Sequence, residues 1–271
     1  MNLEEFSREF DILYNSIASS ASPNIDEYEK SVYLTKAQLE IVKNYFNPLG
    51  NKYGIGFEQS SKRSYDLNNL VESHSSQDFL EDTSKGIDKD SKFTFIPGNV
   101  FLPIQEAAYS NDENLCGTIK VNWEYIKPID VEKVIINSSV KMKVIPKTHD
   151  EVEDQLDNPF KNPNKDEIWR INFNIGNKTS SNKTIELVSP YELSLYKIRY
   201  VRYPKPIILV NLEEEFEDEE LTIEGESNAT ECELHPGIHR EILDRAVELA
   251  TADYRNTNDL QAKMQVNQRN E

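Results

Sequence analysis

The sequence has few of the residues and none of the short motifs that mark the common classes of enzyme. Its 271 residues include only nine glycines and two cysteines, and they contain no glycine-rich phosphate loop, no GxSxG and no CxxC. Cys116 and Cys232 lie far apart in the chain, so we expect no disulfide framework, and a reducing compartment fits. These absences argue against an enzyme, and we predict no catalytic residue, no metal and no cofactor.

Long apolar runs are also missing. No stretch approaches the roughly 20 apolar residues that a membrane-spanning helix needs. Residues 1–10 are charged and amphipathic, without the apolar region of a signal peptide. Apolar residues make up only 37% of the chain, which is low for a globular protein. We therefore expect no membrane contact, and we expect part of the surface to be buried only against a partner.

Positive charge is in the minority. The chain carries 48 Asp and Glu against 30 Lys and Arg, which gives a net charge of −18. A protein that grips duplex DNA needs Lys and Arg to displace counterions from the phosphates, so tight DNA binding is not expected. An acidic wall would let DNA slide past without sticking, although a merely solvated acidic surface explains the same composition.

Apolar spacing predicts helices near both ends of the chain. Residues 3–17, 35–46 and 235–255 each carry one apolar stripe at intervals of three and four. A lone stripe must be buried against another element, so we expect these helices to form a small bundle. The predicted bundle core contains Phe6, Phe10, Leu39, Ile242 and Leu249.

Capping signals set the predicted starts of these helices. Asp26 with Glu29 can form a capping box that opens a short turn, and Thr35 with Gln38 can form another that opens the second helix. A third pair, Thr148 with Glu151, predicts a helix near 148–157 in the middle of the chain.

From residue 93 onward the apolar pattern changes to a period of two. Val140, Met142 and Val144, for example, alternate with Lys141 and Lys143, as a half-buried strand requires. The same argument predicts strands within 93–104, 119–125, 169–173, 185–187, 196–200, 207–210 and 221–223. We expect one sheet system over 93–225, with the helix near 148–157 packed on its edge.

Segregated helices and strands predict an α+β fold, in which the terminal helices form a small bundle and a β-rich region is inserted between them. The expected organisation, in chain order, is N-terminal helices of the bundle at 1–50, a polar connecting segment at 51–92, a β-rich region at 93–234 with the short helix near 148–157, a C-terminal helix at 235–255 and a C-terminal tail at 256–271. Within the connecting segment, residues 65–71 could form a short helix or strand, and residues 73–92 are predicted as a loop.

Three clusters have the residue types of a chemical site, and for each we favour a structural role. His149, Asp150 and Glu151 could act as acid and base, but acidic residues in the first turn of a helix are stabilised by its dipole. His235 and His239 with Cys232 could hold a metal ion, but a helix start is the simpler explanation. Residues 213–220 could chelate calcium, yet they lack the spacing of a calcium loop, so a solvated hairpin tip is expected.

The tail at 256–271 is predicted to dock on a neighbour. Its apolar residues lie two apart, which suits an extended segment that adds along a partner's surface. We expect the tail to be disordered in the free subunit and to order on binding, although a frayed terminus would look the same. The predicted contacts with the neighbour are Tyr254, Leu260, Met264 and Val266.

Five groups of residues carry a resemblance to a known protein family. They are residues 26–38, 148–151 with 158–164, the Tyr-Pro-Lys-Pro-Ile-Ile segment at 203–208, 233–236 and 245–250. Together they resemble structural proteins of crAss-like phages of gut bacteria, and the resemblance covers most of residues 1–255. The order of elements is more loosely similar to head–tail adaptors of short-tailed phages, although this chain is longer, mostly in its β part.

The resemblance implies a structural virion protein that forms a ring, of twelve copies, beneath the portal in the head–tail connector. Its implied partners are further copies of itself, the portal protein and neighbouring tail rings, with DNA passing through the channel unbound. The protein would be made in the cytoplasm of a bacterial host and end in the virion tail. Two other classes stay open at this point: a hydrolase carried as virion cargo, and a host-binding tail appendage.

Overall fold

The computed structural model divides the chain into two compact units. One comprises Met1–Val71 with Tyr203–Glu271, and the other comprises Glu72–Arg202. The structure describes residues 1–17, 24–47, 57–80, 86–111, 139–156, 158, 162–163, 166–172, 182–215 and 221–254. The first unit is mainly helical and the second is a sheet, which confirms a mixed α+β fold.

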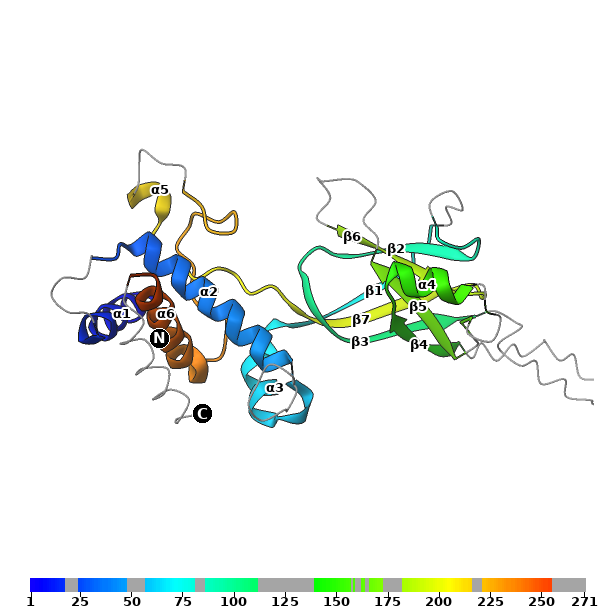
Figure 1. Cartoon of the computed structure of the whole chain (residues 1–271), viewed down its shortest axis with the longest axis horizontal. Helices are drawn as coiled ribbons and strands as arrows, with labels where there is room; N and C mark the ends of the chain where they lie inside the picture. The colour runs from blue at the N-terminus through cyan, green and yellow to red at the C-terminus, as the bar shows by residue number, and fades with distance from the viewer. Residues whose placement is uncertain are drawn as a thin grey trace, which may run out of the picture. The chain divides into compact units, whose positions relative to one another are not determined.

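The helical unit is organised around three helices. These are α1 (Leu3–Ile17), α2 (Glu27–Phe46) and α6 (His239–Tyr254), and α6 contacts both of the others (Figure 1). The shorter elements of the unit are η2 (Phe57–Gln59), α3 (Ser61–Leu67), η3 (Asn68–Leu70), α5 (Leu212–Glu215) and η4 (Pro236–Ile238). In the part of the chain that the structure describes, no helix is both long and apolar enough to cross a membrane.

The predicted bundle core is buried to differing degrees. Phe6, Phe10 and Ile242 have no exposed surface, whereas Leu39 and Leu249 are only partly buried. The buried apolar side chains of α2 that flank Leu39 are Leu34, Ala37, Ile41 and Val42. The bundle with the core named above remains a prediction.

The helix α2 begins earlier than one of the two capping signals predicts. Asp26 is the N-cap, and its carboxylate accepts a hydrogen bond from the Glu29 backbone N–H at 2.7 Å, which confirms the first signal. The predicted helix start at Thr35 is wrong, because α2 continues through it. The side chains of Thr35 and Gln38 bond to a distant segment of the same unit instead of to each other's backbone.

The second unit is a seven-stranded mixed sheet in the described residues. The strands are β1 (Val71–Ser76), β2 (Ser91–Pro97), β3 (Val100–Ser110), β4 (Val140–Pro146), β5 (Glu167–Asn172), β6 (Asn182–Val188) and β7 (Leu195–Arg202). Their order in the sheet is β1-β7-β3-β4-β5-β6-β2. The β4–β5 pair is parallel, and β2–β6, β3–β4, β3–β7 and β5–β6 are antiparallel.

The helix α4 (His149–Leu156) connects the two parallel strands, as a crossover between parallel neighbours requires. It was predicted at the edge of the sheet, but it packs on a face. Val152 is fully buried in a cluster with Trp169 and Ile171 of the interior strand β5. The alternation of β5 explains this, because Ile168 lies in a second cluster on the opposite face.

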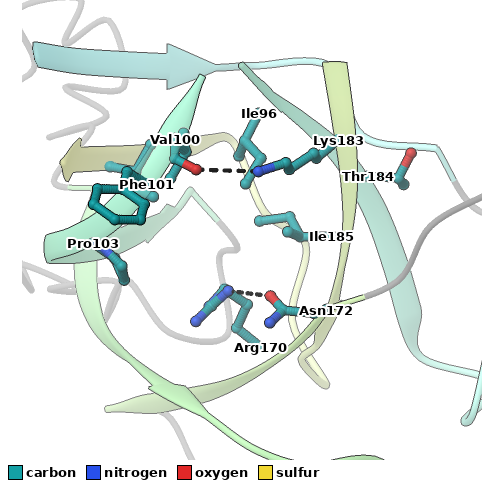
Figure 2. A pocket seen from close by; sticks show the side chains of 10 residues that line it. Ile96, Val100, Phe101, Pro103, Arg170, Asn172, Lys183, Thr184 and Ile185 are labelled. Carbon is teal, nitrogen blue, oxygen red and sulfur yellow. Dashed lines mark hydrogen bonds between the residues drawn. The ribbon is translucent and has the colours of Figure 1, made fainter. Parts of the chain in front are cut away.

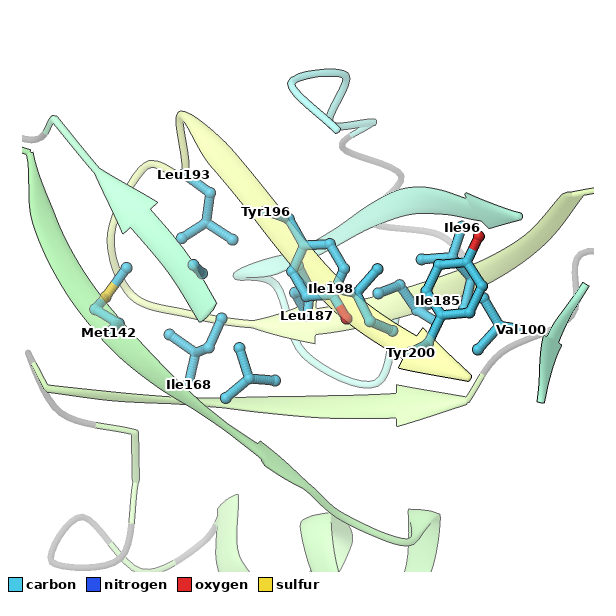
Figure 3. Packing of buried hydrophobic residues seen from close by; sticks show 12 residues of the cluster. Ile96, Val100, Met142, Ile168, Ile185, Leu187, Leu193, Tyr196, Ile198 and Tyr200 are labelled. Atoms are coloured by element: carbon cyan, nitrogen blue, oxygen red, sulfur yellow. The ribbon is translucent and has the colours of Figure 1, made fainter. Parts of the chain in front are cut away.

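That second cluster fills the inside of the curled sheet. Met142, Ile168, Leu187 and Tyr196 are fully buried there, with contributions from β2, β3, β4, β5, β6 and β7 (Figure 3). The two edges of the sheet meet beside it. Leu80 and Phe93 exchange two backbone hydrogen bonds of 2.8 Å, and Thr94 Oγ1 donates to Ser76 Oγ at 2.7 Å. Closure of this kind covers backbone edges that would otherwise pair with other chains.

Several predicted boundaries differ from the structure. Residues 71–76 form the strand β1 although they were predicted as connecting segment and loop, and the compact sheet unit spans 72–202, where the sequence placed a β-rich region at 93–234. The predicted strands at 207–210 and 221–223 make only isolated bridges, at Ile208 with Thr230 and at Ile223 with Glu226. The strand predicted at 119–125 lies outside the described residues.

Truncation of Phe10 tests the interior of the helical unit. Phe10→Ala should lower the free energy of unfolding by about 3–5 kcal/mol, because a fully buried phenyl ring leaves a cavity. The matched control on the same helix is Ile12→Ala, which removes a side chain that is 61% exposed and should cost less than about 1 kcal/mol. Chemical denaturation of both variants measures the difference. A loss below about 1 kcal/mol for Phe10→Ala would contradict the predicted bundle core.

Candidate functional site

The acid–base candidate on α4 is a helix start. The Glu151 N–H donates to Thr148 Oγ1 and the Thr148 N–H donates to the Glu151 carboxylate, both at 3.3 Å, so the predicted capping box is present. His149 Nε2 lies 3.2 Å from the Asn172 carbonyl oxygen. The capping role predicted for Thr148 and Glu151 is therefore confirmed.

The metal candidate is also a helix start. His235 Nδ1 accepts a hydrogen bond from the Gly237 N–H at 3.1 Å, and the buried His239 places Nε2 3.0 Å from the Leu234 carbonyl oxygen. Burial raises the pKa of the Cys232 thiol to about 11. Among the described residues no three His, Cys, Asp or Glu side chains are grouped as a metal site would need.

The residues predicted to bind the portal or a neighbour lie at or beyond the described end of the chain. Tyr254 is the last residue of α6, and its side chain is outside the described part. Leu260, Met264 and Val266 are outside it as well. Of the acidic run at 213–220, the structure describes Glu213, Glu214 and Glu215, all exposed on α5.

A row of polar side chains on α2 holds the segment that follows the sheet unit. Thr35 Oγ1 accepts the Ile207 N–H at 3.1 Å and lies 3.3 Å from the Ile207 carbonyl oxygen, to which it donates. The Leu209 N–H donates to Ser31 Oγ at 3.0 Å. Gln38 Nε2 donates to the Lys205 carbonyl at 3.3 Å. We call these three side chains, Ser31, Thr35 and Gln38, the α2 clasp.

The alternation of the bound segment matches the α2 clasp. The N–H groups of residues 205, 207 and 209 all find acceptors, the first on the Glu233 carboxylate at 3.0 Å. Pro204 and Pro206, which alternate with residues 205 and 207, are buried. A proline has no N–H that burial could leave unpaired. This explains the Tyr-Pro-Lys-Pro-Ile-Ile pattern as a requirement for laying an extended chain on a helix.

Two cations, the buried Lys30 and the partly exposed Arg245, connect the helices. Lys30 of α2, which is 3% exposed, lies 2.8 Å from both Asp11 of α1 and Glu27 of its own helix. Arg245 of α6 bonds Glu40 of α2 at 2.7 Å and Glu248 at 3.1 Å. Burial alone would lower the pKa of both cations, but their bonds to carboxylates raise it, so both remain charged.

The sheet unit contains a pocket of about 360 Å³ inside its curl, walled by Ile96, Ile185 and Ile198 (Figure 2). Two of its cationic side chains have partners within the chain. Lys183 Nζ donates to the Val100 carbonyl at 3.1 Å, and Arg170 bonds Asn172. Lys183 and Arg170 therefore have structural roles in the wall of the pocket.

Arg170 also forms the most buried ion pair of the described sheet unit. Its Nε lies 2.9 Å from a Glu106 carboxylate oxygen, and the two side chains are 10% and 8% exposed. The Tyr196 hydroxyl donates to the same carboxylate at 2.9 Å. Burial raises the pKa of Glu106, and the charge of Arg170 opposes that rise.

Comparison of the sequence with known proteins identifies a family of structural phage proteins. A family model described as phage tail ring protein 3/4 matches residues 1–261. The chain belongs to this phage tail ring protein family. Of its relatives in Bacteroides phage crAss001, a ring protein 4/5 is 41% identical over the full length of both chains. A ring protein 3 is 34% identical over 92% of this chain and 95% of the relative.

Membership in a ring protein family confirms the resemblance to crAss-like phage structural proteins. It also makes the outer surfaces of this ring protein the candidate functional sites, because a ring subunit works through contacts with its neighbours. Sequence reasoning missed the α2 clasp. Its signal in the sequence has two parts: the polar residues Ser31, Thr35 and Gln38, spaced four and three apart on one helix, and the alternating prolines of residues 203–208.

Removal of one clasp hydroxyl tests its contribution. Thr35→Val keeps the shape of the side chain but leaves the Ile207 N–H and carbonyl buried without their partner, which should cost about 2–4 kcal/mol. The control Thr222→Val makes the same change at an exposed loop position and should stay within about 0.5 kcal/mol. Equal unfolding free energies for the two variants would show that the clasp stabilises nothing.

The buried ion pair of the sheet unit gives a second test. Glu106→Gln removes the charge that compensates Arg170, and the uncompensated buried cation should cost about 3 kcal/mol. Glu192→Gln makes the same substitution at an exposed position. Thermal unfolding should separate the two variants, and a Glu106→Gln variant as stable as Glu192→Gln would contradict the role assigned to the pair.

Proposed function

We propose that this chain is the structural subunit of a tail ring in the head–tail connector of a crAss-like phage virion. Twelve copies form a closed ring below the portal, join the capsid portal to the tail and surround the channel through which DNA passes. The subunit has no catalytic activity and needs no cofactor. It is synthesised in the cytoplasm of the bacterial host and functions in the virion.

The observation that supports this proposal most is the match along the whole chain. A protein named ring protein 4/5 aligns with all of it, and the family model spans 261 of its 271 residues, so both the helical and the sheet unit are shared with ring proteins. Two relatives from one phage are named as different rings. These names support a subunit that stands in a series of related tail rings.

The charge of the chain supports a channel that does not retain DNA. A net charge of −18 makes the average surface repel phosphates, so DNA has no stable binding site on a wall with this charge. Weak interaction suits a passage through which DNA must move during packaging and ejection.

The assembled mass tests the ring. The purified chain, concentrated or taken from tails, should give a particle of twelve times the 31.3 kDa subunit mass by native mass measurement, and a hollow ring in electron micrographs. A trimer would instead indicate a fibre or appendage protein, and a monomer with hydrolytic activity would indicate virion cargo. Either result would overturn the proposal.

The C-terminal tail provides a separate test of the contact with neighbours. A chain without residues 257–271 should still fold but should bind portal or adjacent ring protein at least ten-fold more weakly, because it lacks the extended apolar segment. Replacing Leu260, Met264 and Val266 together by Ser should have the same effect. The control replaces the interleaved Asn258, Gln261 and Gln265 by Ser and should bind normally. Unchanged affinity of the truncated chain would refute a docking tail.

A further inference from the structure

The outer face of the sheet unit carries a cluster of positive charge, which is unexpected in a chain of net charge −18. Lys141 and Lys143 of β4 and Lys197 and Arg199 of β7 are all exposed, on the face opposite the core residues Met142, Tyr196 and Ile198. We call these four side chains the cationic face.

The strand order brings the four residues together. β3 lies between β7 and β4, and its Ala107 pairs with Lys197 on one side and with Lys143 on the other. The two lysines are therefore about 10 Å apart, two strand spacings, with only a methyl group between them. Gln105 pairs with Arg199 and Tyr109 with Lys141, so the floor between the cations is uncharged.

Only Lys143 of the cationic face has a described carboxylate as its ladder partner, Glu167 of β5, on the side away from Lys197. Lys141, Lys143, Lys197 and Arg199 form no ion pair with the described residues, whereas Lys30, Arg170, Arg202 and Arg245 all do. Lys197 Nζ instead lies 5.3 Å from the centre of the Tyr109 ring. The strands concerned are interior strands, so these lysines do not serve to protect a sheet edge. Like charges so close together repel each other and favour an acidic partner.

The same chain has an acidic segment with complementary properties. Residues 213–220 contain seven carboxylates and one phenylalanine. The described start of the segment is firmly anchored, because Leu212 is fully buried with Ile208 and its N–H donates to the Ser227 carbonyl at 2.9 Å. Glu213, Glu214 and Glu215 are exposed and pair with no described Lys or Arg side chain. A segment whose described start is anchored and whose Glu213, Glu214 and Glu215 are not neutralised is suited to contact a cationic surface.

We infer that the cationic face of one copy binds the acidic segment at 213–220 of the adjacent copy in the ring. The inference rests on the proposed ring. Two different surfaces of one chain then meet, which is the heterologous contact that closes a ring. Such a contact brings the complementary charges together in every copy, orients the subunits during encounter and weakens as salt screens it.

Matched charge reversals test the contact in the full chain. The face-reversed variant carries Lys141→Glu, Lys197→Glu and Arg199→Glu, which changes the charge of the cationic face from +4 to −2. The segment-reversed variant carries Glu213→Lys, Glu214→Lys, Glu215→Lys, Glu217→Lys and Asp218→Lys, which changes the charge of residues 213–220 from −7 to +3. The control reverses three other exposed cations, Lys36→Glu, Lys89→Glu and Arg240→Glu, and so has the same net charge of −24 as the face-reversed variant, since each reversal subtracts two from −18. Circular dichroism establishes that each variant is folded.

The face-reversed variant alone and the segment-reversed variant alone should each form rings only at a protein concentration at least ten-fold higher than wild type requires. The control should form rings at the same concentration as wild type. An equal mixture of the face-reversed and segment-reversed variants should restore rings, because an alternating ring makes every contact complementary again. A contact within one chain cannot be restored by mixing. Failure of the mixture, or normal assembly of the face-reversed variant, would overturn the inference.

Cross-linking of wild-type protein provides a measurement that needs no variant. A carbodiimide that joins lysine to carboxylate should link Lys141, Lys143 or Lys197 to residues 213–220, and a mixture of isotopically light and heavy chains should give links between the two. Wild-type rings without this link would overturn the inference and leave the proposed function standing. A face-reversed variant that assembles normally but loses retention of duplex DNA would assign the face to nucleic acid. Wild-type chains that form no ring would overturn the proposed function itself.

Discussion

The arrangement of the helical unit depends on hydrogen bonds between helix side chains and the backbone of an extended segment. Ser31, Thr35 and Gln38 project from α2 and bond the backbone of residues 205–209, which has no full strand partner in the described structure. Buried N–H and carbonyl groups must be paired, and here a helix replaces a sheet as their partner. The segment then buries Ile207 and Ile208 completely, and its anchoring also fixes α5 through Leu212.

The helix α2 contacts the segment at 205–209 through the clasp and also contacts α1 and α6. Leu34, Ala37 and Val42 are buried along with the hydroxyls of the clasp, Lys30 connects α2 to α1, and Arg245 connects α6 to Glu40 of α2. The buried charge of Lys30 and the buried hydroxyls require specific partners, so they specify one arrangement more strictly than apolar contacts would. A ring subunit needs such definition because errors in shape accumulate around a closed ring.

The sequence predicted the parts of this fold that depend on local signals. Asp26 and Thr148 cap the helices that their spacing predicts, and the alternation of Val140, Met142 and Val144 with lysines is that of β4. The predictions from sequence were wrong where the structure of a segment depends on residues far away in the chain. Thr35 has the residue types of a capping box, but its hydroxyl is bonded to Ile207. The apolar run at 207–210 has a strand's composition, but its N–H groups bond to a helix.

The same limit applies to the sheet and to the surfaces. The strand β1 has few apolar residues, and only its place beside β7 makes it a strand. Lys141 and Lys143 could be assigned to an outer face from the sequence, but their proximity to Lys197 and Arg199 depends on β3 lying between β4 and β7, an order that spacing along the chain does not give. The absence of recognised enzyme motifs, in contrast, was visible from composition and fits the ring proteins that the chain resembles.

The most direct test of the account is a cryo-electron microscopy map of the virion tail that contains this protein. The account predicts a closed ring of copies around the tail axis below the portal, with the helical and sheet units of each copy recognisable and the sheet unit of one copy in contact with the acidic segment of the next. Copies located in a fibre, in an appendage or inside the capsid would contradict it.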